Sequence, residues 1–248
     1  MIKIEKTDVY GWDAAIRGMR NPMNSWEKSD SDYKSKCLVF PDVEYCLPDC
    51  HYDQCMCTDP EFIIGDNDHA LMMKLARGGS VHAKYRRMIT VTVDITAPLY
   101  WWKEFDTYKV GTVANSCSTM HKIQAKEFTV DDFSHEHLDD TEINAEYDLD
   151  GMGGTICING TSAYTVLVDT VAVLNAYREL FLETNDKKYW WQMIQLLPSS
   201  YNQKRTILLN YEVLVGMYRD RKNHKLDEWH VFCDWIRKLP YSEIIIGD

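Results

Sequence analysis

Residues 88–121 read MITVTVDITAPLYWWKEFDTYKVGTVANSCSTMH, and this stretch carries the strongest information about the fold. Met88–Thr96 is β-branched at most positions and alternates in polarity, which predicts a strand. Pro98 suits the first turn of a helix, and the aromatic residues after it predict a helix to Lys109. Gly111 ends this pattern and a polar run begins. The stretch therefore predicts a strand, an aromatic helix and a polar loop in succession.

The polar run contains side chains that suit nucleotide binding. They are Thr112, Asn115, Ser116, Ser118 and Thr119. Small hydroxyl and amide groups beside accessible backbone N–H groups can bind a phosphate or the edge of a nucleobase. The neighbouring aromatic residues can line a site for a planar ring. A core helix followed by an ordinary polar loop is the alternative, and composition alone favours neither interpretation.

The C-terminal half is predicted to be largely helical. One helix begins at Thr161 or Ser162 and ends near Glu183, and a second spans Lys187–Leu197 before Pro198. A third is expected over roughly 204–221.

A fourth C-terminal helix is indicated by apolar residues at the spacing i, i+3, i+4, i+7, which are Trp229, Phe232, Cys233 and Ile236. Met1–Lys6 and Glu243–Ile246 have the composition of short strands. Together the elements predict an α+β fold, with a small mixed or antiparallel sheet and a helix-rich C-terminal half.

The predicted third helix carries a second candidate binding surface. The residues at i, i+4, i+7 and i+11 on one face are Asn210, Leu214, Met217 and Arg221. Eleven residues at 1.5 Å each separate Asn210 from Arg221 by roughly 16 Å, about the length of an extended nucleotide. Arg221 lies in the densest basic cluster, with Arg219, Lys222, His224 and Lys225. This arginine could bind a phosphate through two hydrogen bonds, or the cluster is a solvated helix C-terminus, where cations are favoured.

Composition and charge exclude several classes of protein. The chain has 248 residues, of which 45% are hydrophobic and 26% charged, as in an ordinary soluble globular protein. The formal net charge is -11, which disfavours DNA and RNA as partners. Residues 131–150 are acidic without any Lys or Arg, and we expect an acidic and glycine-containing loop over 131–154. No apolar run predicts a signal peptide or membrane span, so a cytoplasmic protein without membrane contact is expected.

The segment 21–60 is predicted to be an irregular, cysteine-rich excursion from a single domain that spans 1–248. Its cysteines are Cys37, Cys46, Cys50, Cys55 and Cys57, with His51 among them. A zinc site at Cys37–Cys57 is one interpretation. The spacing lacks paired C-x2-C motifs, so reduced thiols in a variable loop are favoured.

At both candidate surfaces the sequence resembles the flavin-dependent thymidylate synthases, the ThyX family. The family signature is Arg-His-Arg, a short spacer with Ser, then Asn-Glu-x-Ser-x-Arg-Tyr, after a strand and a helix. Asn115 and Ser118 match this signature directly, and Thr112 stands in for the spacer serine. Arg-His-Arg is replaced by 107–109, which reads Thr-Tyr-Lys. The motif glutamate is Ser116, and Arg-Tyr is replaced by Met-His at 120–121.

The C-terminal part resembles the same family. Leu197-Pro198 precedes a helix with Asn210, Arg221 lies where the family's nucleotide-binding arginine falls, and His224 follows it. The resemblance covers roughly residues 65–239. The chain looks like a member of a divergent subgroup of the family.

The resemblance implies a ThyX-like fold and an enzyme that methylates dUMP to dTMP with FAD, NADPH and methylenetetrahydrofolate, as a homotetramer. It implies catalytic roles for Ser118, which would orient or polarise the uracil, and for Arg221. Nucleotide binding would use Asn115, Ser116, Ser118 and Arg221. The flavin would contact Thr107, Tyr108, Lys109, Thr112, Asn210 and His224. A flavoenzyme for another pyrimidine nucleotide and a non-catalytic nucleotide-binding protein are the alternatives.

Overall fold

The computed structural model describes residues 2–38, 45–46, 57–149 and 154–247. The chain forms two compact units, and each is assembled from separate stretches of sequence. The first unit comprises Met1–Glu5, Asp94–Thr107 and Ala114–Thr206, and the second comprises Lys6–Val93, Tyr108–Val113 and Ile207–Asp248.

A four-stranded sheet has the strand order β1-β4-β8-β5. Its strands are β1 (Lys3–Tyr10), β4 (Thr90–Pro98), β8 (Asn202–Asn210) and β5 (Val113–Ser116). The side chains of β4 alternate between half-buried threonine or aspartate and buried Val91, Val93 and Ile95. This alternation confirms the predicted strand, with bounds shifted by two residues.

The aromatic helix α3 (Leu99–Phe105) belongs to the core of the first unit. Trp101, Trp102 and Phe105 are buried, and the Trp102 indole N–H donates to the carbonyl of Gln203 at 2.9 Å. The helix ends at Phe105 and not at the predicted Lys109. Its aromatic side chains contact one another within the unit.

Two antiparallel helices, α4 (Ala163–Thr184) and α5 (Lys187–Leu196), form the rest of this unit with the hairpin β6 (Ile143–Leu149) and β7 (Gly154–Thr161). Ser162 caps α4, because its hydroxyl accepts a hydrogen bond from the backbone N–H of Thr165 at 3.1 Å. Their shared core is made of Ile123, Phe128, Phe133, Leu167, Val171, Leu174 and Met193. Both predicted helices are confirmed.

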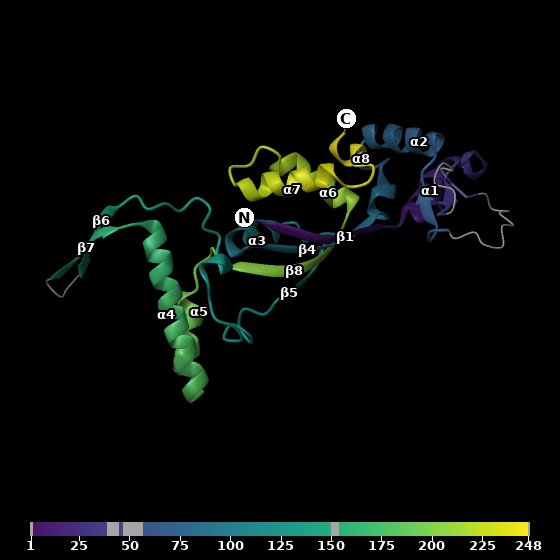
Figure 1. The fold of residues 1–248 in the computed structure, drawn as a ribbon. Coiled ribbons are helices and arrows are strands. Elements are labelled where there is room, and N and C mark those ends of the chain that lie inside the picture. Colours follow the sequence, from purple (N-terminus) through teal and green to yellow (C-terminus); the bar gives the residue numbers. More distant parts are fainter. Residues whose placement is uncertain (1, 39–44, 47–56, 150–153, 248) are drawn as a thin grey trace. The chain divides into compact units, whose positions relative to one another are not determined.

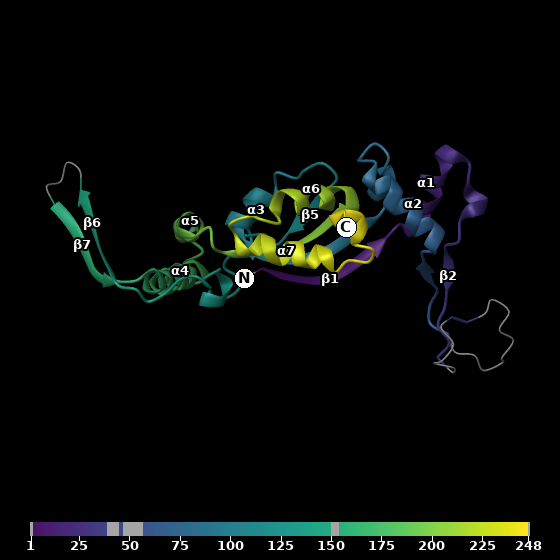
Figure 2. The ribbon, with the colours of Figure 1, turned by 90° about the horizontal axis from the view of Figure 1, so that it is seen from above.

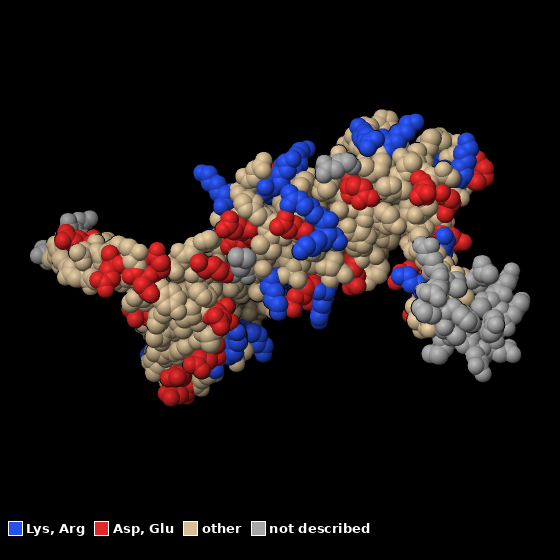
Figure 3. Space-filling model, turned by 45° about the horizontal axis from the view of Figure 1, so that its top comes forward, with Lys and Arg blue, Asp and Glu red and all other residues tan. Residues whose placement is uncertain are grey.

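The hairpin corrects the prediction of a loop over 131–154. Residues 143–149 pair with 154–161 in an antiparallel register, with Tyr147 opposite Ile156 and Ala145 opposite Ile158. The apolar residues between the acids are therefore cross-strand partners. The acidic composition of this stretch did not predict the pairing. Figure 3 shows acidic side chains along this hairpin. None of the helices in the described part of the chain has the length and hydrophobicity that a bilayer crossing requires.

The second unit contains the remaining helices and a short two-stranded sheet. Its helices are α1 (Trp12–Arg20), α2 (Asp66–Arg77), α6 (Tyr211–Arg221), α7 (Asp227–Arg237) and α8 (Glu243–Ile246), with 3-10 turns at 21–23, 26–28 and 84–87. The strands β2 (Asp32–Lys34) and β3 (Glu61–Ile63) pair antiparallel. Figure 2 shows α6, α7 and α8 as neighbouring helices. The buried positions of α7 include the four apolar residues predicted from the spacing.

A buried ion pair between α1 and α2 anchors the start of the segment 21–60. Arg20 and Asp68 are 4% and 0% exposed, and Arg20 Nε lies 2.5 Å from Asp68 Oδ1. The hydroxyls of Ser29 and Ser31 each donate to Asp68 Oδ2 at 2.6 Å. Burial alone raises the pKa of Asp68, but these hydrogen bonds and Arg20 outweigh it and lower the pKa below its usual value. The start of the excursion is therefore tied to the unit.

Two further predictions of secondary structure were wrong. The region 204–221, expected to be one helix, is a strand to Asn210 followed by α6. Ile207 and Leu209 are buried while Leu208 between them is exposed, and this two-residue alternation is that of a strand. The strand expected at Glu243–Ile246 is the short helix α8, in which the adjacent Ile244 and Ile245 are both buried. The first turn of α2 is capped from outside the helix by Asp30, whose carboxylate accepts from the N–H groups of 67 and 68.

Candidate functional site

In the second unit, the segment Tyr108–Val113 lies along α6. The carboxamide of Asn210 caps this helix, because Oδ1 accepts from the N–H of Val213 at 3.0 Å. Gly111 has φ +82°, and a Cβ there would come within 3.0 Å of Val213 Cγ2 and 3.1 Å of Asn210 Nδ2. A side chain at 111 is therefore disfavoured by both backbone conformation and space. Asn210 is the N-cap of α6 rather than a member of its face.

The other end of α6 presents Arg221 to two aromatic rings. Arg221 Nε donates to the hydroxyl of Tyr108 at 2.9 Å. The guanidinium carbon lies 4.6 Å from the Trp229 ring centroid and 5.4 Å from that of Tyr108. The His224 ring lies 6.2 Å from Trp229, which is fully buried. Cation–π contacts and the hydrogen bond to Tyr108 therefore help to hold the guanidinium in one place. We call Tyr108, Arg221, His224 and Trp229 the guanidinium cluster.

Charges of both signs surround the guanidinium cluster. Arg219, Lys222 and Lys225 are exposed at the end of α6, where Arg219 pairs with Asp220 at 2.9 Å. The first turn of α7 adds the carboxylates of Asp227 and Glu228. A guanidinium positioned by aromatic rings is suited to bidentate recognition of a phosphate or carboxylate.

Of three other predicted flavin contacts, Thr107 and Lys109 are exposed and Thr112 is half-buried. The Thr112 hydroxyl donates to the carbonyl of Tyr108 at 2.6 Å, and the Thr107 hydroxyl, in the first unit, donates to the carbonyl of Glu104 at 2.7 Å. Both threonines therefore stabilise local turns, whereas the Lys109 ammonium is accessible.

In the first unit, Asn115 and Ser116 lie on β5 with exposed side chains. The next residue, Cys117, is fixed through its backbone: its N–H donates to the carbonyl of Lys204 at 2.9 Å, and its carbonyl accepts from Gln203 Nε2 at 2.9 Å. Ser118 begins a turn, since its hydroxyl accepts from the N–H of His121 at 2.9 Å. The backbone of this motif is therefore held in place while two of its side chains extend into solvent.

Ser118 also lines a cavity of about 270 Å³ within the first unit. The other lining residues are Cys117, Lys122, Ile123, Lys126, Phe128 and Tyr201. Burial, with Asp132 and Cys117 nearby, raises the pKa of Tyr201, so its phenol remains a hydrogen-bond donor at neutral pH. Lys126 is paired with Asp132, so the donors that could meet a small anion at this cavity are Lys122, Ser118 and Tyr201.

The structure thus gathers four of the predicted residues around α6: Tyr108, Asn210, Arg221 and His224. It places Thr107, Asn115, Ser116 and Ser118 in the first unit. Trp229 is an unpredicted member of the guanidinium cluster, because its spacing from Arg221 carries no recognisable motif. A second unpredicted guanidinium, that of Arg205 in the first unit, stacks on Trp102 at 4.2 Å and pairs with Asp106 at 2.7 Å.

The zinc interpretation remains a prediction. The backbones of Cys37 and Cys57 pair in an isolated antiparallel β-bridge, without a disulfide between their side chains. The N–H of Cys46 donates to the carbonyl of Ser35 at 2.6 Å. Cys50, His51 and Cys55 lie outside the described residues. Within the described ranges, no group of three or more His, Cys, Asp or Glu residues is arranged to hold a metal ion.

Comparison with known proteins gave no matching family model and no matching curated protein. Solved structures do match. Thymidylate synthase X (ThyX) from Helicobacter pylori, with FAD and dUMP, is 14% identical with a TM-score of 0.61, and the alignment covers 100% of this chain and 98% of that one. The UMP/dUMP methylase PolB from Streptomyces cacaoi, bound with 5-Br dUMP, is 13% identical with a TM-score of 0.54 over 100% and 95%. The chain therefore has the fold that ThyX and PolB share.

Proposed function

We propose that this protein is a flavin-dependent, thymidylate-synthase-like enzyme that methylates dUMP at C5 to dTMP with methylenetetrahydrofolate and NADPH. The guanidinium cluster is the observation that carries this proposal. A nucleotide enzyme needs a positioned cation for the phosphate, and Arg221 has its orientation set by Tyr108 and Trp229. The ThyX fold over the whole chain supports the same conclusion.

In this proposal Arg221 binds the nucleotide phosphate. Asn115 and Ser116, with exposed side chains, contribute hydrogen bonds to the nucleotide, and Ser118 orients or polarises the uracil. The Tyr108 hydroxyl accepts from Arg221, so its own O–H proton is directed elsewhere and can donate to a ligand.

The residues of the second unit fit the phosphates and the aromatic ring of FAD. Lys109 presents an exposed ammonium, and Tyr108 presents a half-buried ring. Thr112 lies in the same segment as these two residues, and Asn210 and His224 lie at the two ends of α6. Thr107, in the first unit, is the remaining proposed flavin contact. Bound FAD would supply the redox chemistry, while the protein supplies orientation and charge. Lys109 binds a phosphate as a point charge, without the planar fork of an arginine.

An absorbance spectrum and a proton-release assay test the proposal together. We expect purified protein to show flavin absorbance. We also expect it to release tritium from [5-³H]dUMP only when NADPH and methylenetetrahydrofolate are both present. Omitting the folate serves as the control for uncoupled exchange. A colourless protein whose melting temperature is unchanged by added FAD and by added dUMP contradicts the enzyme proposal.

A related flavoenzyme that modifies another pyrimidine nucleotide is the second candidate. The solved PolB structures with 5-Br dUMP and 5-Br UMP favour it, because PolB is described as acting on both UMP and dUMP. Mass analysis of the product from each nucleotide separates the two enzymes. A non-catalytic nucleotide-binding protein predicts instead that dUMP raises the melting temperature while FAD does not.

We also propose that the protein is a homotetramer. The helix α4 supports an association of subunits, because Val166, Val173 and Leu180 are exposed at seven-residue spacing along it. The hairpin adds exposed Tyr147 and Ile158. Light scattering during size-exclusion chromatography should give four times the mass of one chain, and a monomer at micromolar concentration contradicts the proposal.

A further inference from the structure

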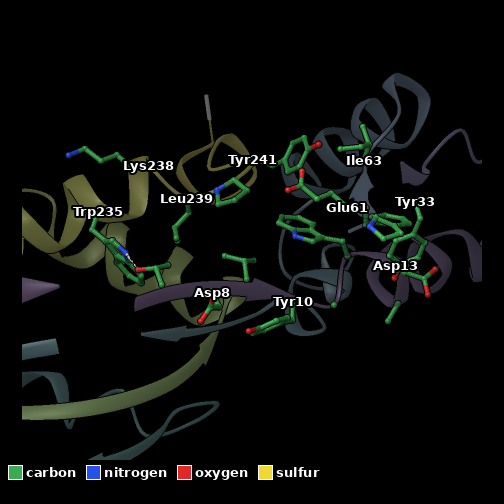
Figure 4. Close-up of a pocket in the computed structure, with 18 residues that line it drawn as sticks. Asp8, Tyr10, Asp13, Tyr33, Glu61, Ile63, Trp235, Lys238, Leu239 and Tyr241 are labelled. Carbon is green, nitrogen blue, oxygen red and sulfur yellow. Dashed lines mark hydrogen bonds between the residues drawn. The ribbon is translucent and has the colours of Figure 1, made fainter. Parts of the chain in front are cut away.

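A second cavity, of about 1060 Å³, lies in the second unit (Figure 4). It is bordered by the end of β1 from Thr7 to Tyr10, the first turn of α1, the β2–β3 pair and the segment 238–241 after α7. None of the predicted nucleotide or flavin residues lines it. Its volume is sufficient for a ligand of several amino-acid residues.

Aromatic side chains that are held by other contacts form the walls of this cavity. The Trp12 ring packs edge-on against Tyr241 at 5.2 Å and against Tyr211 at 5.4 Å. Tyr33 packs against Phe62 at 5.1 Å. The walls are therefore preformed, and the faces of their rings carry the partial negative charge that attracts cations.

The charged groups at this cavity are mainly acidic. Asp13 pairs with Arg17 at 3.2 Å, whereas Asp8 and Glu61 form no ion pair or hydrogen bond through their carboxylates among the residues that the structure describes. In Figure 4 the Lys238 side chain points away from Tyr10, Tyr33 and Tyr241. Lys34, opposite Glu61 in the β2–β3 register, lies over the Tyr45 ring at 4.9 Å. The cavity thus favours a cation and disfavours a nucleotide phosphate.

The strand β1, which borders the cavity, is an edge strand of the four-stranded sheet. Because β1 ends the strand order of the four-stranded sheet, one side of its backbone lacks a partner strand within the described sheet. Such an edge can pair with an added extended peptide. We propose that this cavity binds an extended peptide segment bearing arginine or lysine. Its backbone pairs with Thr7–Tyr10, and its cation lies among the aromatic rings beside Glu61.

Fluorescence anisotropy with a defined peptide tests this proposal. The probe is a fluorescein-labelled pentapeptide that alternates arginine with valine, and the control peptide has glutamate in place of arginine. We expect saturable binding of the arginine peptide only. Glu61→Gln should weaken it about tenfold, since one charged hydrogen bond is lost. Glu146→Gln, on the exposed hairpin, removes the same charge and should leave the affinity unchanged. Equal losses in both variants indicate attraction to bulk negative charge and overturn the proposal.

Hydrogen exchange distinguishes a peptide from a small cation. With the arginine peptide bound, we expect the backbone amides of residues 7–10 to exchange at least about tenfold more slowly, as new strand pairing requires. Arginine ethyl ester should neither slow this exchange nor displace the peptide at the same concentration. Displacement by the ester without amide protection identifies a site for a small cation and overturns the proposal. Neither measurement requires FAD or dUMP.

Discussion

The guanidinium cluster and the Asn115–Ser118 motif are two parts of one predicted site, and their side chains are held in place to different degrees. Arg221 is held by a hydrogen bond and two ring contacts, and its aromatic neighbour Trp229 is fully buried. Asn115 and Ser116 are held only through the backbone of β5, with exposed side chains. The first region therefore contributes to stability as well as to the proposed binding, whereas the side chains of the second make no comparable contribution to stability and are accessible to a ligand.

The largest effect is expected at Trp229. Trp229→Ala should lower the free energy of unfolding by about 3–5 kcal/mol, because a fully buried indole is removed and a cavity remains. Urea denaturation followed by circular dichroism measures the change. Trp191→Ala is the matched control, since that side chain is 43% exposed and should cost less than about 1 kcal/mol. Equal costs at the two positions would contradict the central role of Trp229.

The second-largest effect is expected at Arg221, on the affinity for the nucleotide phosphate. Arg221→Ala should weaken dUMP binding by more than about 1.5 kcal/mol, measured by isothermal titration calorimetry, because a charged hydrogen bond is lost. Arg219→Ala removes the same charge two positions earlier on α6, where the side chain is 75% exposed, and should change the affinity by less than about 0.5 kcal/mol. An unchanged affinity in the Arg221 variant removes this residue from the site.

The stability change expected at Ser118 is smaller than that at Trp229 and larger than that at Asn115. Ser118→Ala should lower the free energy of unfolding by about 1 kcal/mol, because its hydroxyl accepts from the N–H of His121. Ser116→Ala is the control and should remain within about 0.5 kcal/mol of the parent protein, since Ser116 is exposed. Thermal and urea denaturation measure both variants. If Ser118→Ala is as stable as the control, the turn does not depend on this hydroxyl.

The smallest effect on stability is expected at Asn115. Asn115→Ala should leave the free energy of unfolding within about 0.5 kcal/mol of the parent, because the side chain is exposed on β5. Formation of dTMP should nonetheless fall about tenfold, as expected when one hydrogen bond to the nucleotide is lost. Unchanged dTMP formation at saturating and at limiting dUMP would exclude Asn115 from nucleotide binding.

Elements whose signals are local were predicted well. Ser162 caps α4 because the hydroxyl and its N–H partner lie three residues apart, and the α7 spacing directly encodes a buried face. The boundary between β8 and α6 at Asn210 was missed, because a helix pattern and a strand pattern overlap in a short apolar run. The cap at Asp30 was missed because it acts across the excursion, 37 positions from its first partner.

The sequence by itself determined the α+β class, the main helices, and the residue types that a nucleotide site requires. Tertiary structure decided which of these residues meet. Tyr108 and Arg221 are 113 positions apart, yet they form one hydrogen bond beside Trp229. Local propensity depends on neighbours within a few positions, whereas this contact exists only when the segment containing Gly111 packs on α6. A side chain's chemistry is therefore readable from sequence, but its partners follow from packing.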